Sequence, residues 1–117
     1  MEKSTVEYNK GLVVAKVKQS FPNEDQEKIL AILNLYGKET YEQEQERVQI
    51  AILKLSDGDL ERLRKNIETA KRDYRDVLAY AEYPEATSKD TWKMRDKEEV
   101  RRIRERDRQQ YFNWLNS

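Results

Sequence analysis

Residues 60–83 read LERLRKNIETAKRDYRDVLAYAEY, and this segment indicates the fold class. Apolar or small side chains recur in it at alternating spacings of three and four residues. They are Leu60, Leu63, Ile67, Ala70, Tyr74, Val77 and Ala81. This heptad pattern predicts one unbroken amphipathic helix of more than twenty residues, which Pro84 stops. We expect the other segments to pack on this helix or to extend from it.

The composition favours helices over strands. The 117-residue chain has the length of one domain. Charged residues make up 39% of it, and it has only 3 glycines and 2 prolines, so the turn residues that a sheet protein needs are scarce. We therefore predict an all-α helical bundle. Because so polar a chain buries only a modest core by itself, a second subunit would help to cover its long amphipathic faces.

The residue types that are missing from the chain exclude several classes of function. The chain contains no cysteine and no histidine, which removes thiol chemistry, the commonest acid–base catalyst and the commonest transition-metal ligand. The three glycines are isolated, so there is no glycine-rich phosphate loop, and no serine lies in a Gly-x-Ser-x-Gly motif. We therefore expect a protein that is not an enzyme and that uses no cofactor and no metal.

Two groups of carboxylates have helical spacings that suit a hard metal ion or an acid–base pair. They are Glu39, Glu42 and Glu46, and Asp73 and Asp76. A carboxylate site needs ligands from several helices that converge inside a bundle. These side chains lie among Lys and Arg on predicted outer faces, so we expect them to be solvated.

Breaks in the pattern divide the first part of the chain. The segment from Ser4 to Glu7 fits a capping box, and a short helix to about Ser20 follows. Residues Leu12 to Ala15 are also typical of a strand, which is the alternative for this segment. Phe21-Pro22 then breaks the chain, and Asn23 is the predicted N-cap of the next helix.

The middle of the chain predicts a helical hairpin. The second helix is apolar nearly all round from Ile29 to Tyr36, so we expect it to be central or covered on more than one side, with Gly37 at its C′ position. A third helix should run from about Glu39 to Leu55. The tight turn Ser56–Asp59, with its two ends at capping-box spacing, joins it to residues 60–83. Two apolar faces joined by so short a turn predict an antiparallel αα-hairpin.

The end of the chain predicts a long charged helix. A polar connector, Pro84–Lys89, should lead to a helix from about Asp90 to Asn113. We therefore divide the chain into a helical core, residues 1–89, and a charged C-terminal helix with an aromatic tail, residues 90–117. The apolar side of that helix and the tail form a candidate interface. Its members are Trp92, Val100, Ile103, Tyr111, Phe112, Trp114 and Leu115, and Asp96 and Asp107 interrupt that side.

A basic stripe runs beside the apolar side of the last helix. It comprises Lys93, Lys97, Arg101, Arg104 and Arg108. Such a stripe suits contacts with nucleic-acid phosphates. However, the residues from Pro84 onward include nine basic and seven acidic groups, and the whole chain has 23 of each, which opposes a strong phosphate field. A salt-bridged, solvent-exposed helix is the simpler interpretation, so nucleic-acid binding is the alternative function.

Parts of the chain resemble a group of small uncharacterised bacterial proteins. The resemblance is carried by Arg47–Ser56, Ala70–Leu78 and Ala81–Pro84, with Phe21-Pro22 and Tyr36-Gly37 upstream, and it covers somewhat over half of the chain. That group has no assigned activity, so the resemblance implies a bacterial, cytoplasmic protein and no mechanism. The lack of a signal-peptide region after Met1, and of any eighteen-residue apolar run, also favours the cytoplasm over a membrane.

A second pattern is similar to the ubiquitin-binding CUE family. It consists of Phe21-Pro22, Ile29, Leu33, Gly37 and Ala51-Ile52. The family keeps only a short gap between its glycine and the following apolar pair, whereas Gly37 and Ala51 are separated here by about four helical turns. This departure puts the ubiquitin-binding function in doubt.

Together these patterns favour a function by contact rather than by chemistry. We expect a soluble, non-enzymatic protein–protein interaction or dimerisation module. Its expected partner is a second copy of the chain, in a homodimer, or another protein. No part of the sequence predicts a membrane partner.

Overall fold

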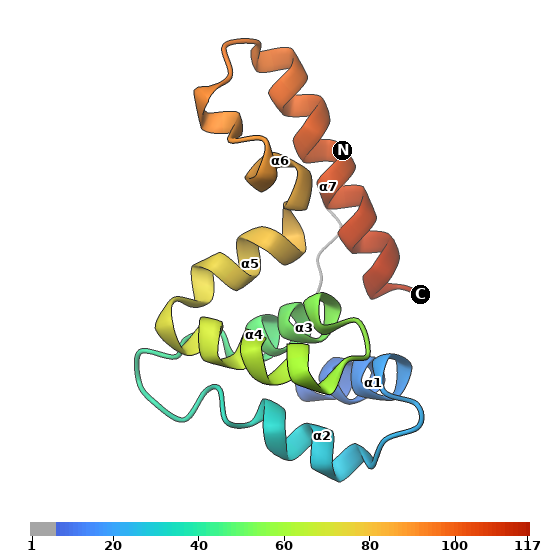
Figure 1. Cartoon of the computed structure of the whole chain (residues 1–117). Coiled ribbons are helices and arrows are strands. Elements are labelled where there is room, and N and C mark those ends of the chain that lie inside the picture. The colour runs from blue at the N-terminus through green and yellow to red at the C-terminus, as the bar shows by residue number, and fades with distance from the viewer. Residues whose placement is uncertain (1–6) are drawn as a thin grey trace.

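A computed structural model describes residues 7–117, and every regular element in that range is a helix (Figure 1). The elements are α1 (Lys10–Ser20), α2 (Gln26–Leu33), α3 (Gln45–Ser56), α4 (Leu60–Arg72), α5 (Tyr74–Glu82), α6 (Pro84–Ser88), the 3-10 helix η1 (Thr91–Lys93) and α7 (Lys97–Leu115). The predicted all-α helical bundle is therefore confirmed. Residues 12–15 lie within α1, which removes the strand alternative for them. The predicted capping box begins at Ser4, outside the described residues, and the N-cap of α1 is Asn9.

Helix α3 is the centre of the fold. Its six consecutive residues from Val48 to Leu53 are all buried, and it packs against α1, α4 and α5. A helix buried in every direction must be covered on all sides by other elements. We predicted that the second helix would be central or covered on more than one side, and it is not central. Helix α2 lies at the edge, where Ala31 is exposed and Leu35, just past its end, is 44% exposed (Figure 1).

The apolar positions predicted from residues 60–83 do face the core, but they lie on two helices. The buried ones are Leu63, Ile67, Ala70, Val77 and Ala81. Asp73 has an extended backbone (φ −159°) that ends α4 and begins α5, and its carboxylate accepts a hydrogen bond from the amide of Arg75. An aspartate that binds a nearby amide in this way competes with the helical hydrogen bond. The single unbroken helix is therefore a wrong prediction.

Helices α3 and α4 form the predicted antiparallel αα-hairpin, with extensive contact between them. The turn contains two residues of positive φ, Asp57 (48°) and Gly58 (76°). Asp59 is the N-cap of α4, since its carboxylate accepts from the amide three residues on. Ser56 does not share in that cap as predicted, because its hydroxyl donates to the Ile52 carbonyl inside α3.

Helix α2 and the start of α3 also differ from the predictions. Asp25, not Asn23, caps α2, because its carboxylate accepts from the amide two residues on. Helix α2 ends at Leu33, and residues 34–44 form a loop where the start of the third helix was predicted. Gly37 has the positive φ expected of it (109°), but it lies inside this loop and not at the C′ position.

The predicted polar connector after Pro84 is helical. Pro84 is the first residue of α6, where a missing N–H costs nothing. The last helix, α7, begins later than predicted, at Lys97. The carboxylate of Asp96 caps it by accepting hydrogen bonds from the amides of Glu98 and Glu99. Trp92 therefore lies in η1 and not on the last helix.

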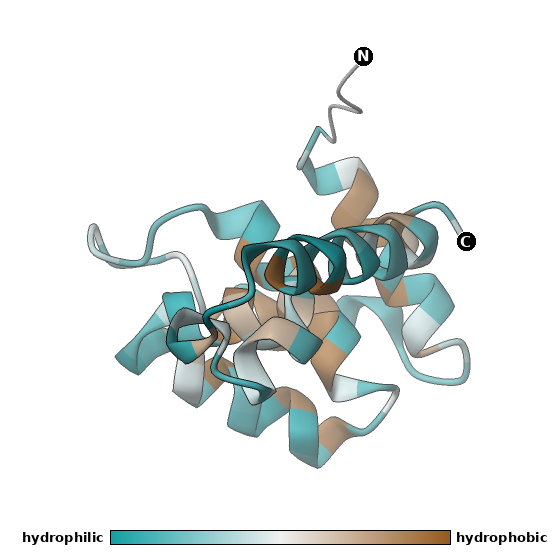
Figure 2. Cartoon of the chain, turned by 90° about the horizontal axis from the view of Figure 1, so that it is seen from above, coloured by the Kyte–Doolittle hydropathy of each residue, from teal (hydrophilic) through white to brown (hydrophobic). Residues whose placement is uncertain are grey.

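The end of the chain forms an arm that projects from a helical body (Figure 1). The arm comprises α6, η1 and the first part of α7, residues 84–108, and the body comprises α1 to α5 with the rest of α7. The molecule measures 46 × 29 × 25 Å, and its radius of gyration is 14.8 Å. A compact domain of ~100 residues has a radius of about 13 Å, so the arm lengthens the molecule. Figure 2 shows hydrophobic residues gathered between the helices and hydrophilic residues along most of the outer side of α7.

The turn between α3 and α4 gives a stability test. A Cβ atom on Gly58 would lie 2.9 Å from the carbonyl oxygen of Ser20, and the residue has a φ of +76°. Both the strain and the clash with backbone oppose a branched side chain, so Gly58→Val should destabilise the fold by at least about 1 kcal/mol. Gly11→Ala, at an exposed position of α1 where a Cβ would lie 3.3 Å from Asn9 Oδ1, is the control and should change stability by less than ~1 kcal/mol. Urea unfolding measures both, and equal stabilities for the two variants would contradict this account of the turn.

Candidate interaction surface on the projecting arm

A buried aspartate joins the two helices of the arm. Asp107 of α7 is 2% exposed, and its carboxylate oxygens accept hydrogen bonds from the amides of Glu85 (3.0 Å) and Ala86 (2.9 Å). These amides belong to the first turn of α6, where no helical carbonyl is available to them. Asp107 is thus an N-cap supplied by another helix, and the dipole of α6 favours its charge.

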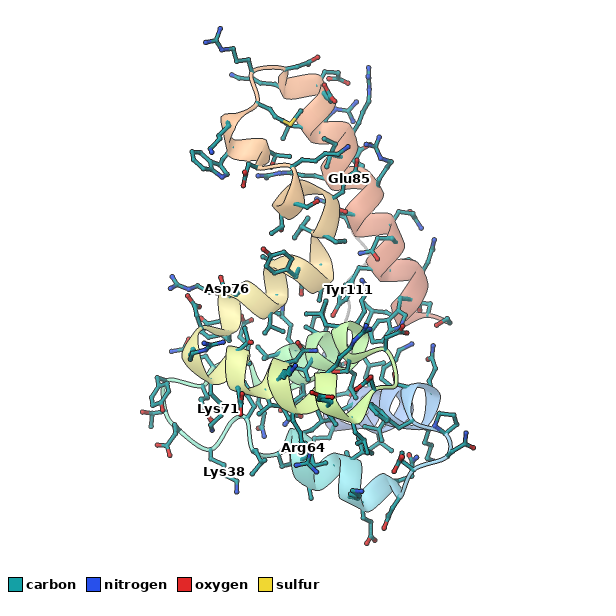
Figure 3. All side chains as sticks on the ribbon, in the orientation of Figure 1. Lys38, Arg64, Lys71, Asp76, Glu85 and Tyr111 are labelled. Carbon is teal, nitrogen blue, oxygen red and sulfur yellow. The ribbon has the colours of Figure 1, made fainter. Side chains whose placement is uncertain are left out.

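An ion-pair group lies on the surface of the same contact (Figure 3). Glu85 accepts a hydrogen bond from Arg106 at 2.7 Å and from Lys89 at 2.8 Å. These cations, Arg106 first, hold the pKa of Glu85 at about 2. Because solvent screens exposed ion pairs, this group orients α6 on α7 more than it stabilises the arm.

The arm has a small apolar contact of its own. Ile103 is fully buried, and Ala86 and Thr91 are each 7% exposed. Ile103 and Ala86 are separate from the main core of the body. So few apolar groups cannot order a segment of this length by themselves, because each ordered residue costs ~1–2 kcal/mol of backbone entropy. The Asp107 cap and the attachment of α7 to the body therefore carry much of the order of the arm.

The other end of α7 is anchored in the body. Tyr111 and Leu115 belong to the main core, and Figure 3 shows Tyr111 where α7 meets the body. Lys16 of α1 donates a hydrogen bond to the carbonyl of Trp114 (2.5 Å), and its Nζ lies 4.6 Å from the centroid of the Trp114 ring. A lysine at a helix C-terminus satisfies a free carbonyl and interacts favourably with the helix dipole. The aromatic tail thus packs on its own chain.

The seven residues of the predicted interface do not form one surface. Those buried within their own chain are Ile103, Tyr111 and Leu115. Those that are half-buried are Val100, Phe112 and Trp114. Trp92 is 78% exposed, and the Nζ of the neighbouring Lys93 lies 4.8 Å from the centroid of its ring. The large apolar surface that remains open on the arm is therefore the Trp92 ring.

The basic stripe is largely unpaired. Arg101 pairs with Glu98 and Glu105, whereas Lys97, Arg104 and Arg108 have no ion-pair partner within residues 7–117. All are exposed. From Lys97 to Arg108 the helix rises about 17 Å. The outer side of α7 thus presents cations at helical spacing, with Trp92 and Lys93 in the segment before it.

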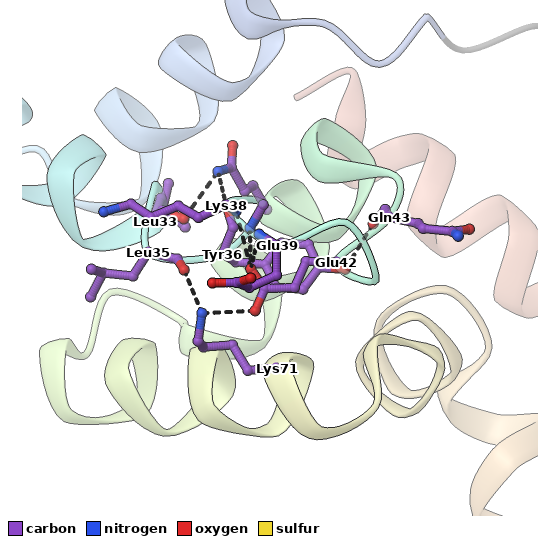
Figure 4. Close-up of polar contacts among 10 residues, drawn as sticks. Leu33, Leu35, Tyr36, Lys38, Glu39, Glu42, Gln43 and Lys71 are labelled. Carbon is purple, nitrogen blue, oxygen red and sulfur yellow. Dashed lines mark hydrogen bonds and ion pairs between the residues drawn. The ribbon is translucent and has the colours of Figure 1, made fainter.

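A second polar site lies in the loop before α3 (Figure 4). Glu42 is 5% exposed, which contradicts our expectation that it is solvated. Its Oε1 accepts hydrogen bonds from the amides of Gly37 (2.9 Å), Lys38 (3.1 Å) and Glu39 (3.3 Å), and its Oε2 accepts one from Lys71 Nζ (2.8 Å). We call these four donors the carboxylate cradle. The cradle binds a negative charge as backbone nests do.

The cradle keeps Glu42 charged. Burial by itself would raise the pKa of Glu42, but the hydrogen bonds from Lys71, Gly37 and Glu39 outweigh it and lower the pKa below its usual value. Burial, aided by the Glu42 carboxylate, raises the pKa of Tyr36 to about 12. A lowered carboxyl pKa means that the contact stabilises the fold fully above the unfolded-state pKa and is lost as the pH falls through the folded-state value.

The other carboxylates singled out in the sequence do not join Glu42. Glu39 and Asp76 are exposed, Glu46 is half-buried, and Asp73 caps α5. Within residues 7–117, no group of three or more acidic, cysteine or histidine side chains is arranged to hold a metal ion. In the same range, no helix is both long and apolar enough to cross a membrane.

Sequence reasoning missed the roles of Asp107 and Glu42. Asp107 had a signal, since it is an acid at a position where the face of α7 is otherwise apolar. Glu42 had none, because it stands among similar acidic residues and its donors are backbone amides, which any sequence supplies.

The Asp107 cap can be tested by unfolding. Asp107→Ala removes two hydrogen bonds to a charged acceptor and leaves two buried amides without a partner, so it should destabilise the fold by about 2 kcal/mol. Asp107→Asn keeps one acceptor and should cost less. Glu105→Ala, an exposed neighbour on α7, is the control and should change stability by less than ~0.5 kcal/mol. If Asp107→Ala matched that control, the arm would not depend on the cap.

Comparisons with protein-family models, with curated proteins and with solved structures give no match to this chain. The two sites that its own geometry supplies are the exposed surface of the arm and the carboxylate cradle. The arm offers an open aromatic ring and unpaired cations to a partner. The cradle is filled by a side chain of the same protein.

Proposed function

We propose that the protein is a non-enzymatic interaction module that binds a second copy of itself through the arm. The observation that carries this proposal is Trp92, a tryptophan that is 78% exposed on a segment projecting from the body. Tryptophan and arginine are the side chains that most often dominate the energy of protein interfaces. Both occur together on the arm, and the arm stands clear of the body, where it can reach another molecule.

The charge distribution supports a second copy as the partner. The residues from Pro84 onward carry nine basic and seven acidic groups, and those before Pro84 carry the remaining 14 basic and 16 acidic groups of the 23 of each. The arm side of one copy is therefore weakly positive and the body of another weakly negative. Because the whole chain has a formal net charge of +0, no long-range repulsion opposes their approach.

Nucleic acid is the second candidate partner, and one structural observation favours it. Asp107 is buried where it caps α6, so it adds no negative charge to the outer side of α7, although Glu98, Glu99 and Glu105 stay exposed there. The outer side of α7 is therefore more positive than its composition implies. An exposed tryptophan beside a lysine also suits stacking on an unpaired base.

Substituting Trp92 tests the proposal. Light scattering of the wild-type chain should give a mass that rises above 14.1 kDa with concentration. Trp92→Ala should remain a monomer at the same concentrations with an unchanged melting temperature, because the ring is exposed and contributes little to the fold. Tyr41→Ala, which removes a 63% exposed aromatic side chain from the body, is the matched control and should associate like the wild type.

The outcomes separate the two partners. A wild-type mass that stays at one chain at every concentration rules out the second copy. Retention of a fluorescent single-stranded DNA that weakens steeply with salt and is lost in Arg104→Ala/Arg108→Ala would then identify nucleic acid, since phosphate contacts release counterions. Contacts made mainly by an apolar ring weaken far less with salt.

A further inference from the structure

The carboxylate cradle is held together by contacts that do not involve Glu42. The carbonyl of Tyr36, directly before the three amides, accepts a hydrogen bond from the buried Gln49 side chain (3.2 Å). The Tyr36 ring is fully buried, and its hydroxyl donates to the carbonyl of Gln43 (2.7 Å). Lys71 is oriented by a second hydrogen bond, to the carbonyl of Leu35 (2.8 Å). Removing the Glu42 side chain therefore leaves the donors in place.

The backbone of the cradle is held in a conformation that brings its three amides together. Gly37 has a φ of +109°, which turns its amide and the next two toward a single point. A Cβ on Gly37 would lie 2.6 Å from side-chain atoms of Gln45, so the space beside it is also filled. The position is thus fixed by backbone conformation and by packing together.

The donors match the shape of a carboxylate. Three amides converge on one oxygen, and the ammonium group of Lys71 binds the other. The side chain of Glu42 is only 1% exposed, so no room is open to water for the further oxygens of a tetrahedral anion. The site therefore fits a flat anion with two oxygens and a small apolar end.

We propose that the cradle is a carboxylate-binding site whose resident ligand is Glu42, and that a free small carboxylate takes its place when that side chain is removed. Glu42→Ala removes four heavy atoms, Cγ, Cδ and the two oxygens, and acetate consists of the same set. A free anion also needs van der Waals distance from the Cβ that remains, so formate and acetate are small enough to fit, and propionate should be too large for a closed space.

Thermal unfolding of Glu42→Ala with added anions tests the site. The variant should melt several degrees below the wild type, because it leaves buried amides and Lys71 without their acceptor. Acetate at neutral pH should restore at least half of that loss, with saturation at millimolar concentrations, since a ligand of the folded state stabilises it. Chloride at equal ionic strength and propionate should restore much less.

Three controls decide whether acetate acts in the cradle. The wild-type protein and Glu42→Gln both keep the space filled, so acetate should move their melting temperatures by less than about 1 °C. Glu42→Ala/Lys71→Met lacks the cation and should lose the response to acetate. An equal effect of acetate on all four proteins, or a response that chloride reproduces, overturns the proposal.

A variant that fails to fold does not leave the proposal untested. If Glu42→Ala is unfolded in buffer, recovery of its helical circular dichroism with acetate supports the site, and no recovery overturns it. In the intact protein, the amide proton resonances of Gly37, Lys38 and Glu39 should shift together as the Glu42 carboxyl is titrated with acid. Amides that shift independently of that carboxyl would contradict the cradle.

Discussion

The fold depends on enclosing α3 on all sides. A helix buried from Val48 to Leu53 has no face left for polar side chains, so Gln49 must find partners inside the protein. Its amide nitrogen donates to the carbonyls of Leu33 and Tyr36, where α2 ends and the loop begins, and the Leu33 carbonyl also accepts from the amide of Tyr36. One buried side chain thus satisfies the end of one helix and fixes the loop that carries the cradle.

The attachment of the arm follows the same rule. In the C-terminal turn of α5, two backbone carbonyls accept hydrogen bonds from other elements at the junction between body and arm, and one of them, that of Ala79, also accepts from the amide of Tyr83. The carbonyl of Ala81 accepts hydrogen bonds from Lys54 of α3 (3.0 Å) and from Gln110 of α7 (3.3 Å), and that of Ala79 accepts one from Thr87 of α6 (3.1 Å). Three elements are thereby joined at one helix end. The direction of the arm is set by polar satisfaction as much as by apolar packing.

Beside this junction lies an ion pair that is buried on its carboxylate side. Arg47 of α3 binds both oxygens of Glu82, at 2.8 and 2.7 Å, and Glu82 is 8% exposed. Replacing both partners of such a pair by apolar residues changes the free energy of unfolding little. Removing one partner lowers it far more, because the other charge is then buried alone. The pair therefore selects one arrangement of α3 and α5 against others. It serves specificity of packing rather than net stability.

The acidic residues illustrate how a balanced composition becomes an unbalanced surface. Asp107 and Glu42 are acceptors for backbone amides in the interior, so they contribute little to the outer face. Lys97 and Arg104 have no comparable internal role and point to solvent. Folding does not change the net charge of the chain. A partner that binds the arm contacts only the charged groups that the fold leaves on the surface.

The all-α class, the hairpin of α3 and α4 and the buried positions such as Leu63 and Ile67 were determined by the sequence alone, because helical periodicity and turn residues act locally. The break at Asp73 comes from a local cap, in which its carboxylate accepts from the amide of Arg75. The central place of α3 and the roles of Asp107 and Glu42 were decided only by the tertiary structure. Each depends on groups that are distant in the chain or on backbone amides and carbonyls, whose positions no residue pattern encodes. A carboxylate in a sequence is equally a surface charge or a buried acceptor until the fold brings donors to it.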